Sequence, residues 1–407
     1  MTCELMPVAD ARARILADLQ AMPAEPAVLT EAHGRVLAED VAARTTQPPL
    51  AVSAMDGYAV RAADVASVPV ALNVVGAVPA GGQHEGTIGP GEAVRIFTGA
   101  PLPDGADTIV IQEDTERDGD TVTVNEGAAE GRYVRKAGLD FAEGDVLLRA
   151  GTTLSARDIG LAAAMDHPWL KVSRRPRVAL LATGDEIFLP GERRGPTGIV
   201  SSNTFALEGL VRAAGGEPVT LGIAPDDRAA ISAMAEGARD MDMLVTTGGA
   251  SVGEHDLVRD ALGDIGLELD FWQIAMRPGK PLMFGRLGDV PMLGFPGNPV
   301  SSTVCGVLFL APALAQMLGT GQTEPVRETA VLGVDLKEND RREDYLRSEL
   351  AREGDRLVAT PFSLQDSSNF ARLTRADCLV IRPPQAPAAK SGDPVEFIRL
   401  GDGSIRI

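Results

Sequence analysis

A glycine-rich stretch at residues 246–256 carries the residue types best suited to chemistry in this sequence. It reads Thr-Thr-Gly-Gly-Ala-Ser-Val-Gly-Glu-His-Asp, follows a short apolar run and precedes a helical pattern. Glycines lack the Cβ atom that keeps a ligand away from the backbone, and amides at the start of a helix bind anions. Glu254 and Asp256 add carboxylates beside those amides. Taken alone, the stretch is typical either of an ordinary turn or of a site that holds phosphate together with a divalent cation.

Further charged residues follow other predicted turns and complete a candidate constellation. Carboxylates outnumber cations in it, as expected of a magnesium site that water and substrate phosphate complete. Lysine and arginine would neutralise phosphate or oxyanion oxygens. Asn298 followed by Pro299 predicts a strong helix start whose amides and dipole face an anion. The set comprises Asp56, Thr98, Asp140, Glu186, Asp226 or Asp227, Asp256, Arg277 and Lys280.

Several common kinds of site are unsupported by the sequence. No G-x-G-x-x-G or P-loop pattern occurs at a predicted strand–helix junction, which argues against dinucleotide and Walker-type binding. The cysteines Cys3, Cys305 and Cys378 are far apart, so neither a disulfide framework nor a thiolate metal site follows. His255 lies between two acidic residues at a helix start and is more typical of a surface residue than of a catalytic base.

Composition predicts a multidomain protein whose ligands are small. The 407 residues exceed one ordinary domain. A formal charge of −19 disfavours nucleic acid or an anionic membrane as the main partner, since both need a basic surface. The N-terminal residues do not resemble a signal peptide, and the apolar stretch 304–318 is shorter than the ~20 residues of a membrane span. We therefore expect a cytoplasmic location.

Periodicity in the first part of the chain predicts a β-rich module inside a helical unit. Residues 8–22 have the spacing of an amphipathic helix, and 45–58 read as an ordered loop with two prolines. Short β-branched runs between glycine and proline clusters fill residues 65–150. Helical spacing returns over residues 154–164, which indicates that one domain is inserted into another.

From Arg177 onward, strands and helices alternate and predict a doubly wound, mostly parallel sheet. Ligands in such sheets bind at the carboxyl ends of strands, and the glycine-rich and charged motifs follow such ends. Predicted strands are 178–182, 218–223, 241–246 and 290–295, and predicted helices are 204–214, 228–239, 257–262 and 300–318. After about residue 324, short strands at 329–334, 346–350, 357–361, 378–382 and 395–400 predict a small β domain.

Six motifs run through almost the whole chain: 53–60 (SAMDGYAV), 98–103 (TGAPLP), 183–186 (TGDE), 248–253 (GGASVG), 278–281 (PGKP) and 296–299 (PGNP). In this order they resemble the molybdenum insertase family (molybdopterin molybdotransferase). The resemblance implies a multidomain α/β plus β protein that forms an elongated homodimer. Its expected parts are a helical-β linker domain (1–50 and 139–173), an inserted β-rich domain (51–138), a doubly wound molybdopterin-binding α/β domain (174–322) and a C-terminal β-barrel (323–407).

The resemblance also implies the reaction and the residues that perform it. The family hydrolyses adenylylated molybdopterin with Mg²⁺, transfers molybdate to the dithiolene and releases AMP, in a cleft between the α/β domain of one subunit and the inserted domain of the other. Catalytic roles would fall on Asp56, Thr98, Asp140, Glu186, Asp227, Asp256 and Lys280, with Glu186, Asp227 and Asp256 holding the metal. Cofactor-binding roles would fall on Gly248, Gly249, Ser251, Gly253, Arg277, Lys280, Pro296, Gly297, Asn298 and Pro299. Transient contacts with a molybdopterin adenylyltransferase and with molybdoenzyme chaperones are further implied.

This sequence departs from the family pattern in places, and other functions stay open. Arg277 stands where relatives often have lysine, Asp226 and Asp227 compete for one role, and residues 365–368 replace a glycine-containing form. A molybdopterin adenylyltransferase is one alternative, which the β insertion and the C-terminal β domain disfavour. A non-catalytic molybdopterin-binding scaffold is another, for which the acidic site residues would be unnecessary.

Overall fold

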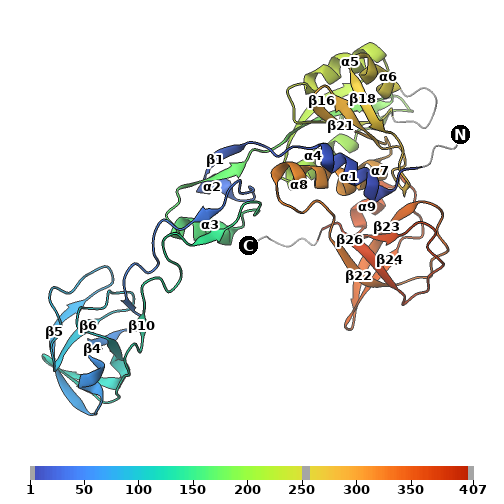
Figure 1. Ribbon diagram of the computed structural model, residues 1–407. Coiled ribbons are helices and arrows are strands. Elements are labelled where there is room, and N and C mark those ends of the chain that lie inside the picture. Colours follow the sequence, from blue (N-terminus) through green and yellow to red (C-terminus); the bar gives the residue numbers. More distant parts are fainter. Residues whose placement is uncertain (1–4, 250–256, 402–407) are drawn as a thin grey trace.

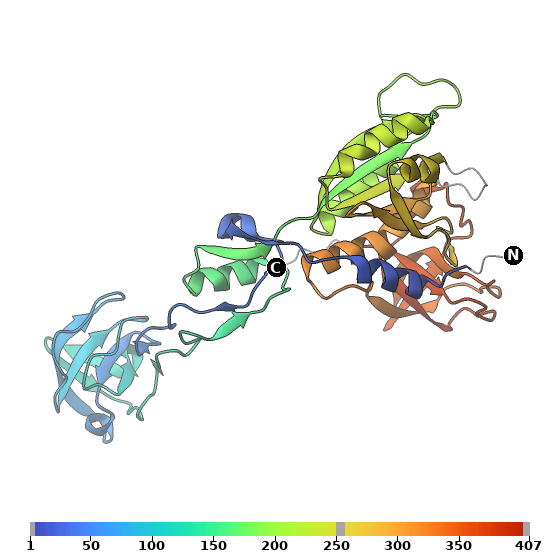
Figure 2. The same cartoon turned by 45° about the horizontal axis from the view of Figure 1, so that its top comes forward.

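The computed structural model describes residues 5–249 and 257–401, which form an elongated molecule (Figures 1 and 2). A β-rich unit, coloured blue to cyan, lies at one end, and a small linker unit lies in the middle. An α/β unit in yellow-green and a β-barrel in orange-red lie together at the other end. The units at the two ends are therefore far apart within one chain.

The α/β unit contains a six-stranded sheet. Its strand order is β16 (Glu217–Ala224), β13 (Arg177–Thr183), β17 (Met243–Thr247), β21 (Val290–Phe295), β20 (Met283–Leu287) and β18 (Leu267–Phe271). The first four strands are parallel, which confirms the mostly parallel sheet. Strands β20 and β18, not predicted from the sequence, add an antiparallel edge. Successive residues of β13 join different hydrophobic clusters, so both faces of the strand are covered.

Helices cover the two faces of this sheet. They are α4 (Asn203–Ala213), α5 (Arg228–Ala235), α6 (Leu257–Asp264), α7 (Pro299–Cys305) and α8 (Ala311–Leu318), with a π-helical turn at Gly306–Leu310 between the last two. The continuous helix Pro299–Leu318 is long and apolar enough to cross a membrane, but 72% of its apolar window is buried inside the molecule. It is therefore the core helix of this unit.

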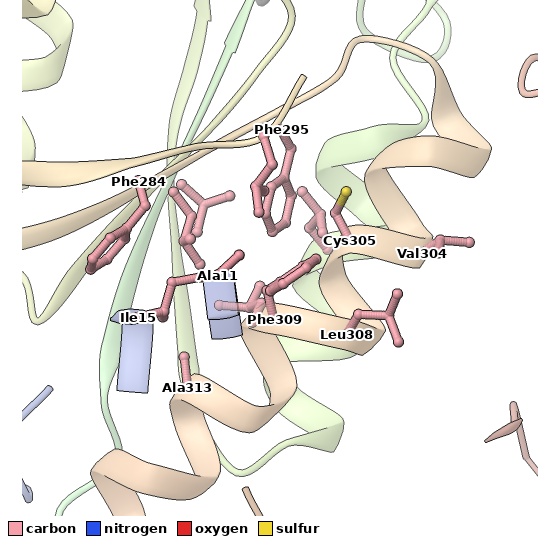
Figure 3. Close-up of a cluster of buried hydrophobic side chains, with 14 of the residues drawn as sticks. Ala11, Ile15, Phe284, Phe295, Val304, Cys305, Leu308, Phe309 and Ala313 are labelled. Atoms are coloured by element: carbon pink, nitrogen blue, oxygen red, sulfur yellow. The ribbon is translucent and has the colours of Figure 1, made fainter. Parts of the chain in front are cut away.

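The N-terminal helix packs on the α/β unit rather than on the linker unit that residues 1–50 were predicted to join. Helix α1 (Val8–Asp18) ends four residues before the predicted end at 22. Its buried side chains enter the main hydrophobic cluster beside α7 and α8. Figure 3 labels Ala11, Ile15, Phe284, Phe295, Val304, Cys305, Leu308, Phe309 and Ala313 in this cluster. Helix α1 therefore lies at one end of the molecule, and the chain after it crosses to the linker unit.

The linker unit is built from two separate stretches of sequence. Strand β1 (Ala24–Val28) pairs antiparallel with β12 (Trp169–Ser173), and β2 (Val41–Ala42) pairs with β11 (Val146–Leu148). Helices α2 (Leu29–Ala32) and α3 (Ala156–Ala164) complete the unit, and Ser155 and Asp158 form a capping box at α3. At the exit to the β-rich unit, the Gln47 amide donates to the Phe141 carbonyl at 2.9 Å. This pair closes a neck through which the chain leaves and returns, as the predicted insertion requires.

The inserted unit holds a second six-stranded sheet. Its strand order is β7 (Thr108–Ile111), β4 (Gly57–Val60), β6 (Glu92–Ile96), β5 (Val70–Val78), β9 (Thr121–Val124) and β8 (Thr115–Asp118). The short pair β3 (Val52–Ser53) and β10 (Val134–Arg135) lies beside the neck. The segment 45–58, predicted as a loop, thus contains β3 and the start of β4, because its prolines at 48 and 49 exclude helix but leave the residues beyond them free to form strands.

The C-terminal unit is a closed barrel. Its strands are β22 (Arg327–Leu332), β23 (Glu343–Glu353), β24 (Arg356–Pro361), β25 (Cys378–Arg382) and β26 (Pro394–Arg399), and α9 (Phe370–Arg375) lies outside. The sheet runs β23-β24-β22-β26-β25, and β25 pairs again with β23. Strand β19 (Met276–Arg277) of the α/β unit pairs with β23 and fastens the barrel to that unit. The predicted β-barrel is confirmed.

Candidate functional site

A cavity of about 510 Å³ opens at the carboxyl ends of β13, β17 and β21. Its walls are the turns after these three strands, the starts of α4 and α7, and Ser368 of the C-terminal unit. This is the sheet edge at which open α/β folds bind ligands. Another cavity, of about 570 Å³, lies at the joint between the linker and α/β units and contains none of the predicted site residues. The first cavity is therefore the candidate site.

Two glycine turns meet on one side of this cavity. Gly248 has a φ of +93°, and a Cβ atom there would lie 2.4 Å from the carbonyl oxygen of Thr183. Gly249 has a φ of +64°, and a Cβ atom there would lie 2.2 Å from a methyl group of Val258. A Cβ atom on Gly297 would lie 3.5 Å from the Cα atom of Gly248. The turns after β17 and β21 thus leave backbone, not side chains, at the cavity wall.

Two helices also begin at the cavity. The predicted start at Pro299 is confirmed, with Asn298 as the N-cap of α7, and α4 begins at Asn203. Neither N-cap side chain bonds to its own helix among the described residues. The N-cap of α4 is Ser202, and the side-chain amide of Asn203, the first residue of that helix, donates to the Gly297 carbonyl at 2.8 Å. The side-chain amide of Asn298 donates to the Ser367 hydroxyl at 3.1 Å. The positive N-terminal ends of α4 and α7 thus meet at the cavity, and the side chains of Asn203 and Asn298 bond to neighbouring segments rather than to these helix ends.

Buried hydroxyl groups add polar atoms without partners. Thr183, which lines the cavity, is 3% exposed, and its Oγ1 atom has no hydrogen-bond partner within the described part of the chain. The same holds for Thr246 Oγ1 on the neighbouring strand. A buried hydroxyl without a partner costs free energy that a bound ligand can recover. The glycine turn, the helix starts and Thr183 together form a cradle suited to the oxygens of an anion.

Most of the predicted cofactor-binding residues lie at this cavity. Glu186 lines it, as do Gly248, Gly249, Pro296, Gly297, Asn298 and Pro299. Lys280 precedes the lining residue Pro281, is partly buried, and forms no ion pair with any described residue. The predicted residues Ser251, Gly253 and Asp256 lie outside the described residues.

Two predicted residues have other contacts in the structure. The Arg277 guanidinium contacts Asp344, and it lies 3.4 Å from Asp340 and 3.3 Å from the Asn339 side chain. Arg277 therefore ties β19 to the barrel and does not line the cavity. Asp227 is the N-cap of α5, where its carboxylate accepts from the Ala230 amide at 2.8 Å.

Asp56 and Thr98 form a pair at the far end of the molecule. Asp56 Oδ1 accepts the Thr98 amide at 2.8 Å and the Thr98 hydroxyl at 2.7 Å. The bond from the Thr98 amide, then that from its hydroxyl, holds the pKa of Asp56 below its ordinary value. Both residues belong to the inserted unit, whereas the cavity lies in the α/β unit. Asp140 is exposed near the neck, where its amide donates to the Gln47 carbonyl at 3.0 Å.

The structure does not assemble the predicted metal ligands. Within residues 5–249 and 257–401, no three histidine, cysteine, aspartate or glutamate side chains are placed to hold a metal ion. Glu186 offers one exposed carboxylate at the cavity, and Asp256 lies outside the described residues. Magnesium needs only one or two carboxylates when water and phosphate supply its other ligands. The cavity therefore fits a metal that binds together with a phosphate-bearing ligand.

Sequence reasoning missed two contributions to the cavity. Residues 201–203 (Ser-Ser-Asn) line it where α4 begins, and three small polar residues at a helix start were a signal for a cap or a ligand. Ser368 lines it from the C-terminal unit, and its neighbour Ser367 accepts from the lining residue Asn298, both in the segment that departs from the family pattern. No local pattern could have shown that this segment lies beside Asn298.

Three successive parts of the chain match the models of known protein families. Residues 6–165 match the MoeA N-terminal region (domain I and II), 179–316 a probable molybdopterin binding domain, and 329–400 the MoeA C-terminal region (domain IV). A molybdopterin molybdenumtransferase of Nostoc sp. is 36% identical over 387 residues, which cover 91% of this chain and 88% of that protein. The chain belongs to the molybdopterin molybdenumtransferase family.

Other members of this family agree in sequence and in structure. Molybdopterin molybdenumtransferase 2 of Mycobacterium tuberculosis is 39% identical over 320 residues, covering 76% of this chain and 78% of that protein. A crystal structure of a molybdopterin biosynthesis MoeA protein from Pyrococcus horikoshii superimposes with a TM-score of 0.86 at 31% identity, covering 98% of this chain and all of the other. The predictions of this family, of a multidomain fold and of a transferase are therefore confirmed.

Proposed function

We propose that this protein transfers molybdenum from molybdate to molybdopterin at the cavity on the α/β unit. The activated substrate is adenylylated molybdopterin, in which water cleaves the phosphoanhydride to give AMP and molybdopterin. The two dithiolene sulfurs then replace two oxygens of molybdate, which leave as water with protons from the thiols and solvent. The supporting observation is the anion cradle, in which the start of α4, without a side-chain cap, and the glycine turns meet Thr183.

The cavity residues have separate tasks in this proposal. First-turn amides of α4 and the backbone at Gly248 receive oxyanion or phosphate oxygens, and the Thr183 hydroxyl donates one further hydrogen bond. Lys280 supplies positive charge beside the cavity in a chain whose formal charge is −19. Without such local positive charge, the overall field would repel anionic substrates.

A magnesium ion is part of the proposal. Glu186 and Asp256 would hold it, and Asp227 could contribute only the oxygen that does not cap α5. When bound, Mg²⁺ neutralises the negative charge that gathers on the cleaved anhydride. The three cysteines are far apart in the sequence, so the sulfur ligands of molybdenum belong to the pterin.

We further propose that two subunits complete each site. Asp56 and Thr98 lie in the inserted unit, far from the cavity of their own chain (Figure 1). A homodimer in which the inserted unit of one subunit meets the α/β unit of the other would bring them together. The proposed setting is the cytoplasm, with transient contacts to a molybdopterin adenylyltransferase and to molybdoenzyme chaperones.

The reaction is tested with purified protein and adenylylated molybdopterin. We expect AMP release and molybdenum retained on the pterin, each dependent on molybdate and Mg²⁺. Asp256→Asn keeps the side-chain size and removes the charge, so turnover should fall far more than folding stability. Adenylylation of free molybdopterin from ATP without molybdenum transfer would instead identify an adenylyltransferase, and tight pterin binding without turnover would identify a scaffold.

The shared site is tested by subunit complementation. Differently tagged Asp56→Ala and Asp256→Ala subunits are co-expressed, and the heterodimer is isolated with both tags. One of its two sites would then contain both defects and the other neither, so about half of the wild-type activity should return. Heterodimers that stay as inactive as either parent would reject a site built from two subunits.

A further inference from the structure

The side chain of Arg95 contacts the residues on both sides of the Asp56–Thr98 pair. It lies on β6 directly opposite Tyr58 of β4, and β6 continues into Phe97 and Thr98. Its guanidinium carbon lies 5.2 Å from the ring centre of Tyr58 and 4.8 Å from that of Phe97. Contact with two aromatic rings restricts the guanidinium to one place and orientation.

The same guanidinium holds the backbone around Asp56. One nitrogen donates to the Gly57 carbonyl at 2.9 Å, and another donates to the Gln112 side chain at 2.6 Å. The backbone amide of Gln112 in turn donates to the backbone carbonyl of Asp56 at 3.1 Å. Arg95 thus directly fixes the peptide group between Gly57 and Tyr58, and it holds the carbonyl of Asp56 through Gln112.

The carboxylate of Asp56 is held from the other side by the residue that follows Phe97. Thr98 donates both its bonds to Oδ1 of Asp56, and among the described residues Oδ2 has no hydrogen-bond partner. One carboxylate oxygen is therefore anchored while the other is available to a ligand or to another subunit. The two bonds from Thr98 lower the pKa of this carboxyl, and the nearby positive charge of Arg95 adds to that lowering.

We propose that Arg95 is the positioning residue of the Asp56–Thr98 pair, holding one oxygen of Asp56 in place for the partner's cavity. This inference rests on the proposed function, in which Asp56 serves the active site. Lysine could not replace arginine here, since only a planar guanidinium can stack between two rings and donate to two acceptors in a fork. A purely structural arginine in this sheet would serve stability and nothing else.

The test compares Arg95→Gln and Arg95→Lys with a matched control, Arg117→Gln. Arg117 is an exposed arginine of β8 in the same unit, and within the described part of the chain its side chain donates only to the Gly119 carbonyl, at 2.9 Å. We expect kcat for molybdenum transfer to fall roughly 10- to 100-fold in Arg95→Gln, because charge-assisted hydrogen bonds are lost. Arg95→Lys should recover only part of this loss, the KM for adenylylated molybdopterin should change little, and Arg117→Gln should match wild type.

A double-mutant cycle separates positioning from stability. In an Asp56→Asn background, Arg95→Gln should cause no further loss of kcat, because the group through which it acts is already gone. If the fold-losses in kcat of the two single variants instead multiply in the double variant, the inference is overturned and Arg95 is a structural residue.

Hydrogen exchange decides the inference independently of activity. The Thr98 amide, bonded to Asp56, should exchange at least about tenfold faster in Arg95→Gln than in wild type, as expected when a local hydrogen bond opens more often. Unchanged exchange at Thr98 would overturn the inference even if turnover fell. A wild-type protein with no transferase activity would refute the proposed function, while Thr98 exchange would still decide the role of Arg95.

Discussion

Replacing Gly248 with alanine is a direct test of the cavity geometry. This glycine lies at the end of β17, where the turn passes the end of β13. An added Cβ atom would lie 2.4 Å from the carbonyl oxygen and 3.0 Å from the hydroxyl oxygen of Thr183. A backbone carbonyl cannot rotate away as a flexible side chain can, so the two strand ends must separate.

The cost of Gly248→Ala follows from two effects. The φ of +93° is unfavourable for an L-residue, which costs about 1–2 kcal/mol. Forcing the extra methyl group against a packed backbone costs about 1–3 kcal/mol more of unfolding free energy. We therefore expect the α/β unit to lose about 2–5 kcal/mol of unfolding free energy. Gly263→Ala is the matched control, because a Cβ atom in that exposed helical position meets nothing within 4 Å. It should stabilise by about 0.4–1 kcal/mol.

Tryptophan fluorescence can report on this unit alone. The chain has two tryptophans, and Trp272 packs against the core cluster of the α/β unit while Trp169 lies in the linker unit. In a Trp169→Phe background, urea unfolding followed by fluorescence therefore measures the stability around Trp272. If Gly248→Ala unfolds at the same urea concentration as Gly263→Ala, the close approach of the two strand ends is refuted.

Three other predictions concern the site and its supports. Lys280→Ala should weaken molybdate binding roughly 10- to 100-fold in calorimetry, because a charge-assisted contact is lost; unchanged affinity would remove this lysine from the site. Asn298→Ala and Ser367→Ala should each destabilise the contact between the α/β and C-terminal units. A double-mutant cycle should give a coupling free energy of about 1 kcal/mol for their hydrogen bond. Fully additive effects would show that this bond contributes nothing to stability. The hydrogen bond from Arg342 lowers the pKa of Asp340 from 3.8 to about 2. Since the folded pKa lies below the unfolded one, this stabilisation is present above pH ~4 and is lost as the pH falls toward 2. Asp340→Asn should flatten the decline in melting temperature over that range, and an unaltered pH profile would contradict the assignment.

Local patterns predicted the parallel part of the sheet but not its antiparallel edge. Strands such as β13 and β17 are short buried apolar runs that end in glycine turns, and this pattern is specific. Strand β20 contains Gly285, which suggests a turn. In the structure a Cβ atom at Gly285 would lie 2.4 Å from the carbonyl oxygen of Glu268 on β18. The glycine allows two strands to approach, a reason that only the folded neighbour reveals.

The site was predictable to the extent that its residues follow strand ends. The Pro296–Pro299 turn and Gly248 lie where the alternation of strands and helices placed them. The contacts of Arg277 could not be predicted, because its partners Asp340 and Asp344 are more than sixty positions away and belong to another unit. A cation near a glycine turn resembles a ligand-binding residue whether it faces the cavity or a neighbouring barrel.

The neck between Gln47 and Phe141 bears on how the chain folds during synthesis. Strands β1 and β2 emerge from the ribosome first, but their partners β12 and β11 are made only after the whole β-rich unit. The inserted unit holds all strands of its own sheet, so it can fold while the linker unit still waits for half of its residues. Folding of the inserted unit brings residues 47 and 141 together and shortens the effective loop that the linker unit must close. A slowly folding insert would therefore delay the whole molecule, since the two ends of the protein are joined only through this late-forming unit.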